Sequence, residues 1–218
     1  MYKCLKSQEN PMSHNLLDMM KNRQSIRKYS SQKISQGVLS SILEAVRWAP
    51  SAHNSQPWRF IVIQDRNTKK SLAGVMAKHW EKQLKTDGVT QEQRESLIEA
   101  SIERFTQPPV IIIACMTMED MDKYPDTGRK KAEFIMAVQS VAAALENLML
   151  AAQSKGLGTC WYCAPLFCQD EVRKILKIPQ TVDPQALITL GYTVGKPSRS
   201  PRKSLDTVIH QEMWEVKK

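Results

Sequence analysis

Glycine is scarce in this chain, with 8 in 218 residues, and aromatic side chains make up only 6% of it. The glycines form no G-x-G-x-x-G, G-x-S-x-G or Walker-type loop, so the turns that dinucleotide folds, serine hydrolases and P-loop enzymes require are missing. Gly156 and Gly158 follow a predicted helix instead of opening one. These three classes of enzyme are therefore excluded.

Long apolar runs are also missing. Stretches such as Val110–Met116 are far shorter than the roughly 20 residues that cross a bilayer. Residues 1–15 lack the apolar centre of a signal peptide. We therefore expect no membrane association and a cytoplasmic location.

Five cysteines, at positions 4, 115, 160, 163 and 168, are an odd number, so a fully paired disulfide framework is not expected. Cys160 and Cys163 have C-x-x-C spacing, but both fall in a predicted strand, away from a helix N-terminus that would lower a thiol pKa. The four histidines are scattered, and zinc needs four ligands. We predict structural cysteines and no metal, with redox and metal roles as alternatives.

The formal net charge is +9, and 42% hydrophobic residues suffice for the core of a single domain covering 1–218. Basic residues cluster at Arg23–Lys28, where Ser25 lies between Arg23 and Arg27, and again at Lys196–Lys203. Two guanidiniums with a hydroxyl between them suit a phosphate monoester. A solvated surface is the alternative. Nucleic acid is not expected, because no aromatic ladder accompanies the charge.

Apolar periodicity predicts helices separated by strands, with a turn at Gly88 and an irregular tail over 200–214. Ser35 is a candidate helix cap, and the run 108–116 predicts a strand buried on both faces. The order of elements indicates an α+β or α/β protein built on a mixed sheet. The predicted helices cover 15–23, 35–49, two segments within 67–105, 129–156 and 169–178; the predicted strands cover 58–65, 108–116, 158–164 and 184–194.

The stretch "WAPSAHNSQPWRF" (Trp48–Phe60) is rich in neutral hydrogen-bonding side chains, and it follows "RQSIRKY" by about twenty-five residues. Together these motifs resemble the FMN-dependent nitroreductase family, and "GLGTCWYCAPLF" and "LGYTVGKPSRSPRKSLDTVI" support the resemblance over nearly the whole chain. The resemblance implies an α+β nitroreductase-like fold, with a central mixed or antiparallel sheet flanked by helices, in an intertwined homodimer.

The resemblance also implies that FMN lies across the dimer interface, with the neutral loop of one subunit against the cofactor held by the other. The N-terminal arginines and Arg202 would hold the phosphate, and Trp161–Ala164 would run along the isoalloxazine ring. The cofactor residues implied are Arg23, Gln24, Ser25, Arg27, Pro50, Ser51, Ala52, Asn54, Gln56, Trp161, Tyr162, Cys163, Ala164, Arg199 and Arg202.

Some positions depart from the family pattern. Ser200 stands where many members have a lysine, which leaves Arg199 or Lys203 as substitutes, and Cys163 stands where well-studied members have an acid. An asparagine and a lysine of those members have no match in 100–104. The string from Gly158 onward resembles the nitroreductase-like domain attached to the ligase that assembles a deazaflavin coenzyme, which suggests a separate branch.

The activity implied is hydride transfer from NADH or NADPH to a nitroaromatic, quinone or enone by a ping-pong mechanism. The flavin carries the chemistry, so we name no catalytic residue and expect His53 to be a hydrogen-bonding spacer. Alternatives are reduction of a dehydro precursor of the deazaflavin coenzyme, and a non-catalytic flavin-binding protein.

Two further segments carry expectations. Residues 76–106 form a lid that selects the small-molecule acceptor, and residues 196–218 form an arm that wraps onto the partner. Four aromatic side chains would line the lid, with core or interface packing as the alternative: His79, Trp80, Phe105 and Tyr124.

Overall fold

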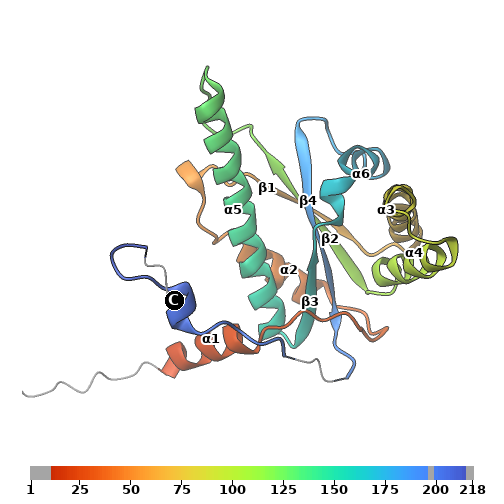
Figure 1. Cartoon of the computed structure of the whole chain (residues 1–218). Coiled ribbons are helices and arrows are strands. Elements are labelled where there is room, and N and C mark those ends of the chain that lie inside the picture. Colours follow the sequence, from red (N-terminus) through yellow and green to blue (C-terminus); the bar gives the residue numbers. More distant parts are fainter. Residues whose placement is uncertain (1–10, 196–198, 215–218) are drawn as a thin grey trace, which may run out of the picture.

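A four-stranded sheet forms the centre of the computed structural model, which describes residues 11–195 and 199–214, with side chains from residue 16 (Figure 1). Its strands are β1 (Trp58–Ile63), β2 (Val110–Thr117), β3 (Leu157–Tyr162) and β4 (Val182–Tyr192), in the order β1-β2-β4-β3. All of these strands pair antiparallel. The predicted mixed sheet is therefore wrong for the described strands, and the antiparallel alternative is confirmed.

The predicted helices are confirmed, with small shifts at their ends. Ser35 caps α2 as predicted, and Gly88, with φ +77°, lies in the turn between α3 and α4. The tail was predicted to be irregular but contains the short helix α7, and β3 ends before Cys163 instead of including it. The helices are α1 (Pro11–Asn22), α2 (Gln36–Val46), α3 (Arg66–Thr86), α4 (Gln91–Thr106), α5 (Thr127–Ser154), α6 (Gln169–Leu176) and α7 (Leu205–Val208), with 3-10 turns η1 (Ala52–Asn54) and η2 (Ala164–Phe167).

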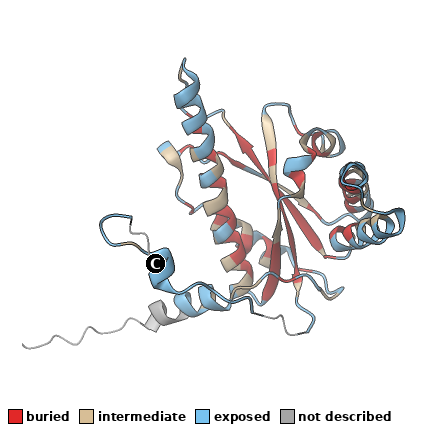
Figure 2. Ribbon diagram, viewed as in Figure 1, coloured by how far each residue is buried: buried red, intermediate tan, exposed pale blue. Residues whose placement is uncertain are grey.

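The β2 strand is buried along its whole length, as its continuous apolar run predicts (Figure 2). Alternate side chains enter two apolar clusters. Ile112 packs with α2 and α5 on one face of the sheet, and Ile111 packs with α3, α4 and α6 on the other. Each helix layer therefore has its own core against a shared sheet.

The α5 helix is 28 residues long and begins at Asp126, whose side chain accepts a hydrogen bond from the Arg129 N–H at 2.9 Å. It ends at Gly156, whose φ of +73° is the left-handed conformation typical of helix ends. An 18-residue window of the helix has a mean hydropathy of 1.6, so by length and composition alone the helix could cross a membrane. Here it packs along the sheet and buries Leu145 and Leu148 completely.

Gly158 on β3 allows the segment after α1 to lie directly against the sheet edge. A Cβ atom at this position would lie 2.5 Å from Ile26 Cγ1, closer than side chains tolerate. The Ile26 N–H donates to the Thr159 carbonyl at 2.8 Å, and Ser25 and Thr159 form an isolated parallel bridge. The absence of a side chain at Gly158 therefore permits this close packing of residues 23–27 against β3.

Tyr29 anchors the end of the same segment. Its hydroxyl lies 2.6 Å from the Thr189 Oγ1, in the middle of β4, and also donates to the Ile26 carbonyl. Burial raises the pKa of the Tyr29 phenol above its ordinary value, so the hydroxyl stays protonated and can donate. The segment is thus held to the sheet at both ends.

We predict that Gly158→Ala destabilises the protein by about 1–3 kcal/mol, because the new methyl group overpacks against Ile26. Urea unfolding at one fixed protein concentration measures the effect. Gly74→Ala is the matched control, since nothing lies within 4 Å of its Cβ position in α3. This control should stabilise the protein by about 0.5–1 kcal/mol. Equal effects of the two substitutions would contradict the close packing.

Candidate functional site

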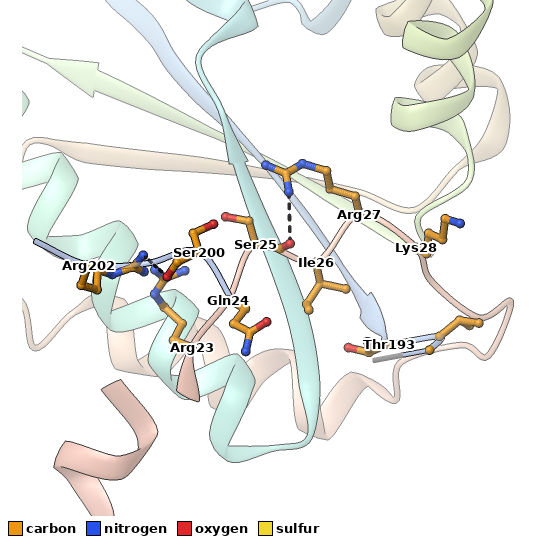
Figure 3. Close-up of a pocket in the computed structure, with 11 residues that line it drawn as sticks. Arg23, Gln24, Ser25, Ile26, Arg27, Lys28, Thr193, Ser200 and Arg202 are labelled. Atoms are coloured by element: carbon orange, nitrogen blue, oxygen red, sulfur yellow. Dashed lines mark hydrogen bonds between the residues drawn. The ribbon is translucent and has the colours of Figure 1, made fainter. Parts of the chain in front are cut away.

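A cavity of about 440 Å³ lies beside β3 where the two basic clusters of the sequence meet (Figure 3). We call it the basic cavity. Among the described residues, four cationic side chains and no acidic one line it. The lining residues are Arg23, Gln24, Ser25, Ile26, Arg27, Lys28, Thr193, Val194, Gly195, Ser200 and Arg202.

Extended backbone after α1 orients the side chains of this segment. Ser25 and Arg27 point to one side, and Gln24 and Ile26 point to the other, as alternation in an extended chain requires (Figure 3). The Arg27 guanidinium donates to the Ser25 carbonyl at 3.4 Å, and Arg202 donates to the Ser200 carbonyl at 3.2 Å. Carbonyl partners hold these groups in place without neutralising them.

Arg23 has a carboxylate neighbour. Its Nε lies 3.7 Å from Glu146 Oε1 on α5, and the Glu146 side chain is half exposed. An ion pair at this distance and exposure is weak. The basic cavity therefore keeps most of its positive charge, and an anion with several oxygens is the ligand that this charge favours.

Other members of the C-terminal cluster lie elsewhere. Arg199 donates to the Asn22 side chain, and neither Arg199 nor Lys203 lines the basic cavity. Lys196 lies outside the described residues. Lys28, which the resemblance did not name, is the fourth cation that lines the basic cavity. Its basic cluster had been recognised, but the motif carried over from the family ended at Arg27.

Several hydrogen bonds of the neutral loop from Pro50 to Gln56 are formed within the loop. Ser51 Oγ accepts from the Gln56 N–H at 3.1 Å, and Ser55 Oγ donates to the Ala52 carbonyl at 2.7 Å. Positive φ angles occur at His53, Asn54 and Gln56, which is unusual for residues other than glycine. Strain of this kind, held by surrounding contacts, is common at binding sites.

Residues 50–56 lie far from residues 23–28 of the same chain (Figure 1). His53 contacts Glu133 of α5 at 3.3 Å, whereas Arg23 contacts Glu146 of the same helix. These glutamates are 13 residues apart, which corresponds to about 20 Å along the helix axis. A single chain therefore does not bring Pro50, Ser51, Ala52, Asn54 and Gln56 together with the arginines.

His53 bonds back to its own chain, in keeping with a spacer role. Its Nε2 lies 3.3 Å from the buried Glu133 and 3.8 Å from Asp122. One ligand atom from each of these three residues lies within 4.8 Å of the others, so this group is where the described residues offer a metal three ligands. The histidines were predicted to be isolated, and this cluster was not predicted, because the carboxylates lie 69 and 80 positions further along the chain.

A second cavity, of about 340 Å³, lies where β3 ends between α3 and α4. We call it the aromatic cavity. His79, Trp80 and Phe105 line it as the lid prediction requires, but Tyr124 does not, because its ring stacks 4.5 Å from the Arg129 guanidinium near the start of α5. The lining residues are Met76, His79, Trp80, Gln83, Ser101, Arg104, Phe105, Tyr162, Cys163, Ala164, Phe167 and Cys168.

Tyr162 lines the aromatic cavity, and its hydroxyl is close enough to Arg27 of the basic cavity for that charge to act on it. Burial raises the pKa of its phenol, and the charges of Arg104 and Arg27 oppose the increase. Arg27 lines the basic cavity and Arg104 lines the aromatic cavity, so both act on the same hydroxyl. Trp161, the preceding residue, lines neither, and its indole N–H is buried without a hydrogen-bond partner among the described residues.

The thiols within the described residues are all unpaired. Cys115, Cys160 and Cys168 are buried, and Cys163 is exposed. Burial raises the pKa of Cys115 to about 12 and that of Cys168 to about 11. Cys4 lies outside the described residues. The predicted structural role therefore fits the three buried thiols.

In a Cys4→Ser variant, we predict that one thiol per chain reacts quickly with a chromogenic disulfide reagent at pH 8. Cys163 is the exposed thiol, whereas a buried thiol with a pKa of about 12 is ionised in only about one molecule in 10⁴ at this pH. Adding Cys163→Ser should abolish the fast phase. Two fast thiols would mean that Cys160 is reactive and that "CWYC" acts as a pair.

Residues 20–192 match the Nitroreductase family. A relative from Archaeoglobus fulgidus, described as a putative NADH dehydrogenase/NAD(P)H nitroreductase, is 31% identical over 91% of this chain and 98% of its own length. The chain therefore belongs to the nitroreductase family, and the predicted class, a flavin-dependent NAD(P)H oxidoreductase, is confirmed. The deazaflavin branch stays a prediction.

Solved structures agree with the fold. A BluB-like flavoprotein from Clostridium difficile 630 superposes with a TM-score of 0.72 at 23% identity, covering 89% of this chain and 97% of that one. Iodotyrosine deiodinase bound to FMN and 3-iodo-L-tyrosine gives 0.69 at 24% identity, covering 87% and 96%. The nitroreductase-like α+β fold is thereby confirmed.

Proposed function

We propose that the chain is an FMN-dependent enzyme that oxidises NADH or NADPH and reduces a small aromatic or quinonoid acceptor, with the FMN phosphate in the basic cavity. The observation that carries the proposal is that, among the described residues, four cationic side chains and no acidic one line a single cavity. The family supplies the reaction class, and the cavity supplies a place for the cofactor's only strongly charged group.

The donor set fits a phosphate monoester. Arg23, Arg27 and Arg202 present guanidinium forks, which match phosphate oxygens in pairs. Ser25 and Thr193 add hydroxyls at the same cavity, and these can complete the oxygen shell. Gln24 also lines the cavity and offers an amide for the ribityl hydroxyls.

The outer edge of β3 suits the polar rim of the flavin ring. The Ser25–Thr159 bridge covers the middle of this edge, and no described strand pairs with it beyond that bridge. The Cys163 carbonyl accepts from the Leu166 N–H at 3.0 Å, and the remaining outward-facing backbone groups of Trp161–Ala164 can hydrogen-bond a planar ligand. The unpartnered Trp161 indole N–H is a further donor for a cofactor lying against this strand.

The neutral loop is best explained by a homodimer. The loop Pro50–Gln56 and Arg23 of the same chain contact α5 at points about 20 Å apart. The loop that touches a given FMN would therefore belong to the other subunit. Exposed apolar side chains for such an interface lie on α1, α5 and the arm 196–218, of which 199–214 are described: Leu16, Leu17, Met20, Phe134, Ile135, Leu205, Val208, Ile209, Met213 and Trp214.

When bound, FMN accepts a hydride from NAD(P)H and delivers two electrons to a second substrate, which gives the ping-pong order. For a nitroaromatic, NAD(P)H and one proton convert the nitro group to a nitroso group and water. The residues of the chain bind and orient both substrates, and none is assigned as a general acid. A cytoplasmic location is part of the proposal.

A visible spectrum of the purified protein tests the proposal. We expect a flavin absorption band that bleaches when NADH or NADPH is added without oxygen and returns when a quinone or nitroaromatic follows. A bound flavin that neither nucleotide reduces would favour the non-catalytic alternative. A colourless protein that FMN does not reconstitute would overturn the cofactor assignment.

We predict that Arg23→Ala lowers FMN affinity at least about 10-fold, because a charge-assisted bond to the phosphate is lost. Flavin fluorescence after dilution measures retention. Glu146→Gln is the matched control, since it breaks the same 3.7 Å ion pair but keeps the guanidinium. This control should retain FMN at least as well as the native chain. Equal losses in both variants would show that the ion pair, and not the phosphate contact, matters.

We predict that Cys163→Ser keeps turnover within a few-fold of the native rate. The thiol is exposed and unpaired, and Cys160 is buried within β3. Cys163 precedes only the four-residue 3-10 turn η2, so neither thiol stands at the N-terminus of an α-helix that would activate it. Steady-state NAD(P)H oxidation with a quinone measures the effect. Abolished turnover with FMN still bound would restore a redox role.

A further inference from the structure

The aromatic cavity is lined by basic but not by acidic residues among those that the structure describes. Arg104 and His79 are its only basic lining residues, and no aspartate or glutamate lines it. His79 Nδ1 lies 3.2 Å from Glu171 Oε1, so that ring is already engaged. The guanidinium of Arg104 is therefore the group in this cavity whose charge can act on a ligand.

No carboxylate on α4 forms an ion pair with Arg104 among the described residues. The adjacent Glu103 accepts a hydrogen bond from the Gln107 side chain, and no carboxylate of the described residues lies within 4.0 Å of the Arg104 guanidinium. The contact that the guanidinium does make is with the Tyr162 ring, at 5.9 Å from its centre. That contact holds the group over the cavity while its N–H groups stay available.

The rest of the lining suits a flat ring. Phe105 and Tyr162 meet edge to face at 5.1 Å, and Trp80 and the exposed Phe167 line the same cavity. Aromatic walls favour a planar aromatic ligand through stacked and edge-to-face contacts. A volume of about 340 Å³ is at the lower end of the range for small-molecule sites, which fits one substituted ring.

We propose that the aromatic cavity selects acceptors that are planar aromatic anions, such as ring carboxylates or phenolates, and that Arg104 is the residue that determines this specificity. This inference rests on the proposed function, because Tyr162, Cys163 and Ala164 form both the cavity wall and the strand end assigned to the flavin ring. In the reaction the carboxylate is unchanged. The nitro group gains two electrons from NAD(P)H and two protons, becomes nitroso and releases water.

A pair of acceptors isolates the charge. 4-Nitrobenzoate and 4-nitrobenzamide share the ring and the nitro group and differ in one negative charge. Trp80 lines the cavity, so quenching of its fluorescence reports binding to the FMN-loaded full chain without turnover. We expect the benzoate to bind about 10-fold more tightly than the amide, as one charge-assisted bond at an exposed site would give. Trp80→Phe should remove the quenching signal.

Arg104→Gln tests the residue. We expect it to bring the ratio of the two affinities, and of the two kcat/KM values, close to one, with the amide changed less than about two-fold. Lys82→Gln is the matched control, because it removes one nearby positive charge from α3 at a position that does not line the cavity. This control should keep the native ratio.

Each failure has a distinct reading. A native ratio near one, or a ratio that Arg104→Gln leaves unchanged, overturns the inference, even when NAD(P)H reduces the flavin normally. Loss of the ratio in Lys82→Gln also overturns it, because general charge would then explain the preference. An unreduced flavin with a normal binding ratio would instead overturn the proposed function and leave the anion site intact.

Discussion

The packing of residues 23–29 against β3 is the constraint on which the candidate site depends. Gly158 allows Ile26 to lie on the strand, the Ile26 N–H bonds to Thr159, and Tyr29 anchors the segment to β4. The extended backbone between these fixed points presents alternate side chains, so the arginines reach the basic cavity while Ile26 is buried. Sheet and cavity are thus parts of one packing arrangement, and a change at a glycine reaches the charge cluster directly.

The basic cavity and the neutral loop differ in their electrostatics. Converging cations destabilise the free protein through mutual repulsion, and an anion removes that cost. In the proposed function the loop lies beside a redox-active ring, where a fixed charge would shift the energy of the reduced, more negative ring. The hydroxyls of Ser51 and Ser55 form hydrogen bonds within the loop, and Asn54 and Gln56 are exposed. Separating the two features along α5 keeps the cations about 20 Å from the loop of the same chain.

The sequence predicted the elements well because each has a strong local signal. The apolar run of β2 is buried on both faces, and Ser35 and Gly88 lie where a cap and a turn were expected. Features set by distant partners were not predictable. Tyr124 pairs with Arg129 instead of the lid, and the antiparallel sheet depends on chain connections that periodicity does not report. The two basic clusters were recognised individually. The packing of residues 23–29 was not predictable, and it decides that Lys28 lines the cavity and Arg199 does not.

The contacts of His53 show why the loop keeps its strained shape. His53, Asn54 and Gln56 adopt positive φ, and each such residue costs of order 1 kcal/mol or more. Contacts to α5 offset this cost, because Ser140 accepts from the Ala52 N–H at 3.2 Å and the buried Glu133 bonds the His53 ring. A buried carboxylate is itself costly without a partner, so Glu133 and His53 stabilise one another. The imidazole thus acts on the position of the loop, and its neighbours Asn54 and Gln56 stay exposed.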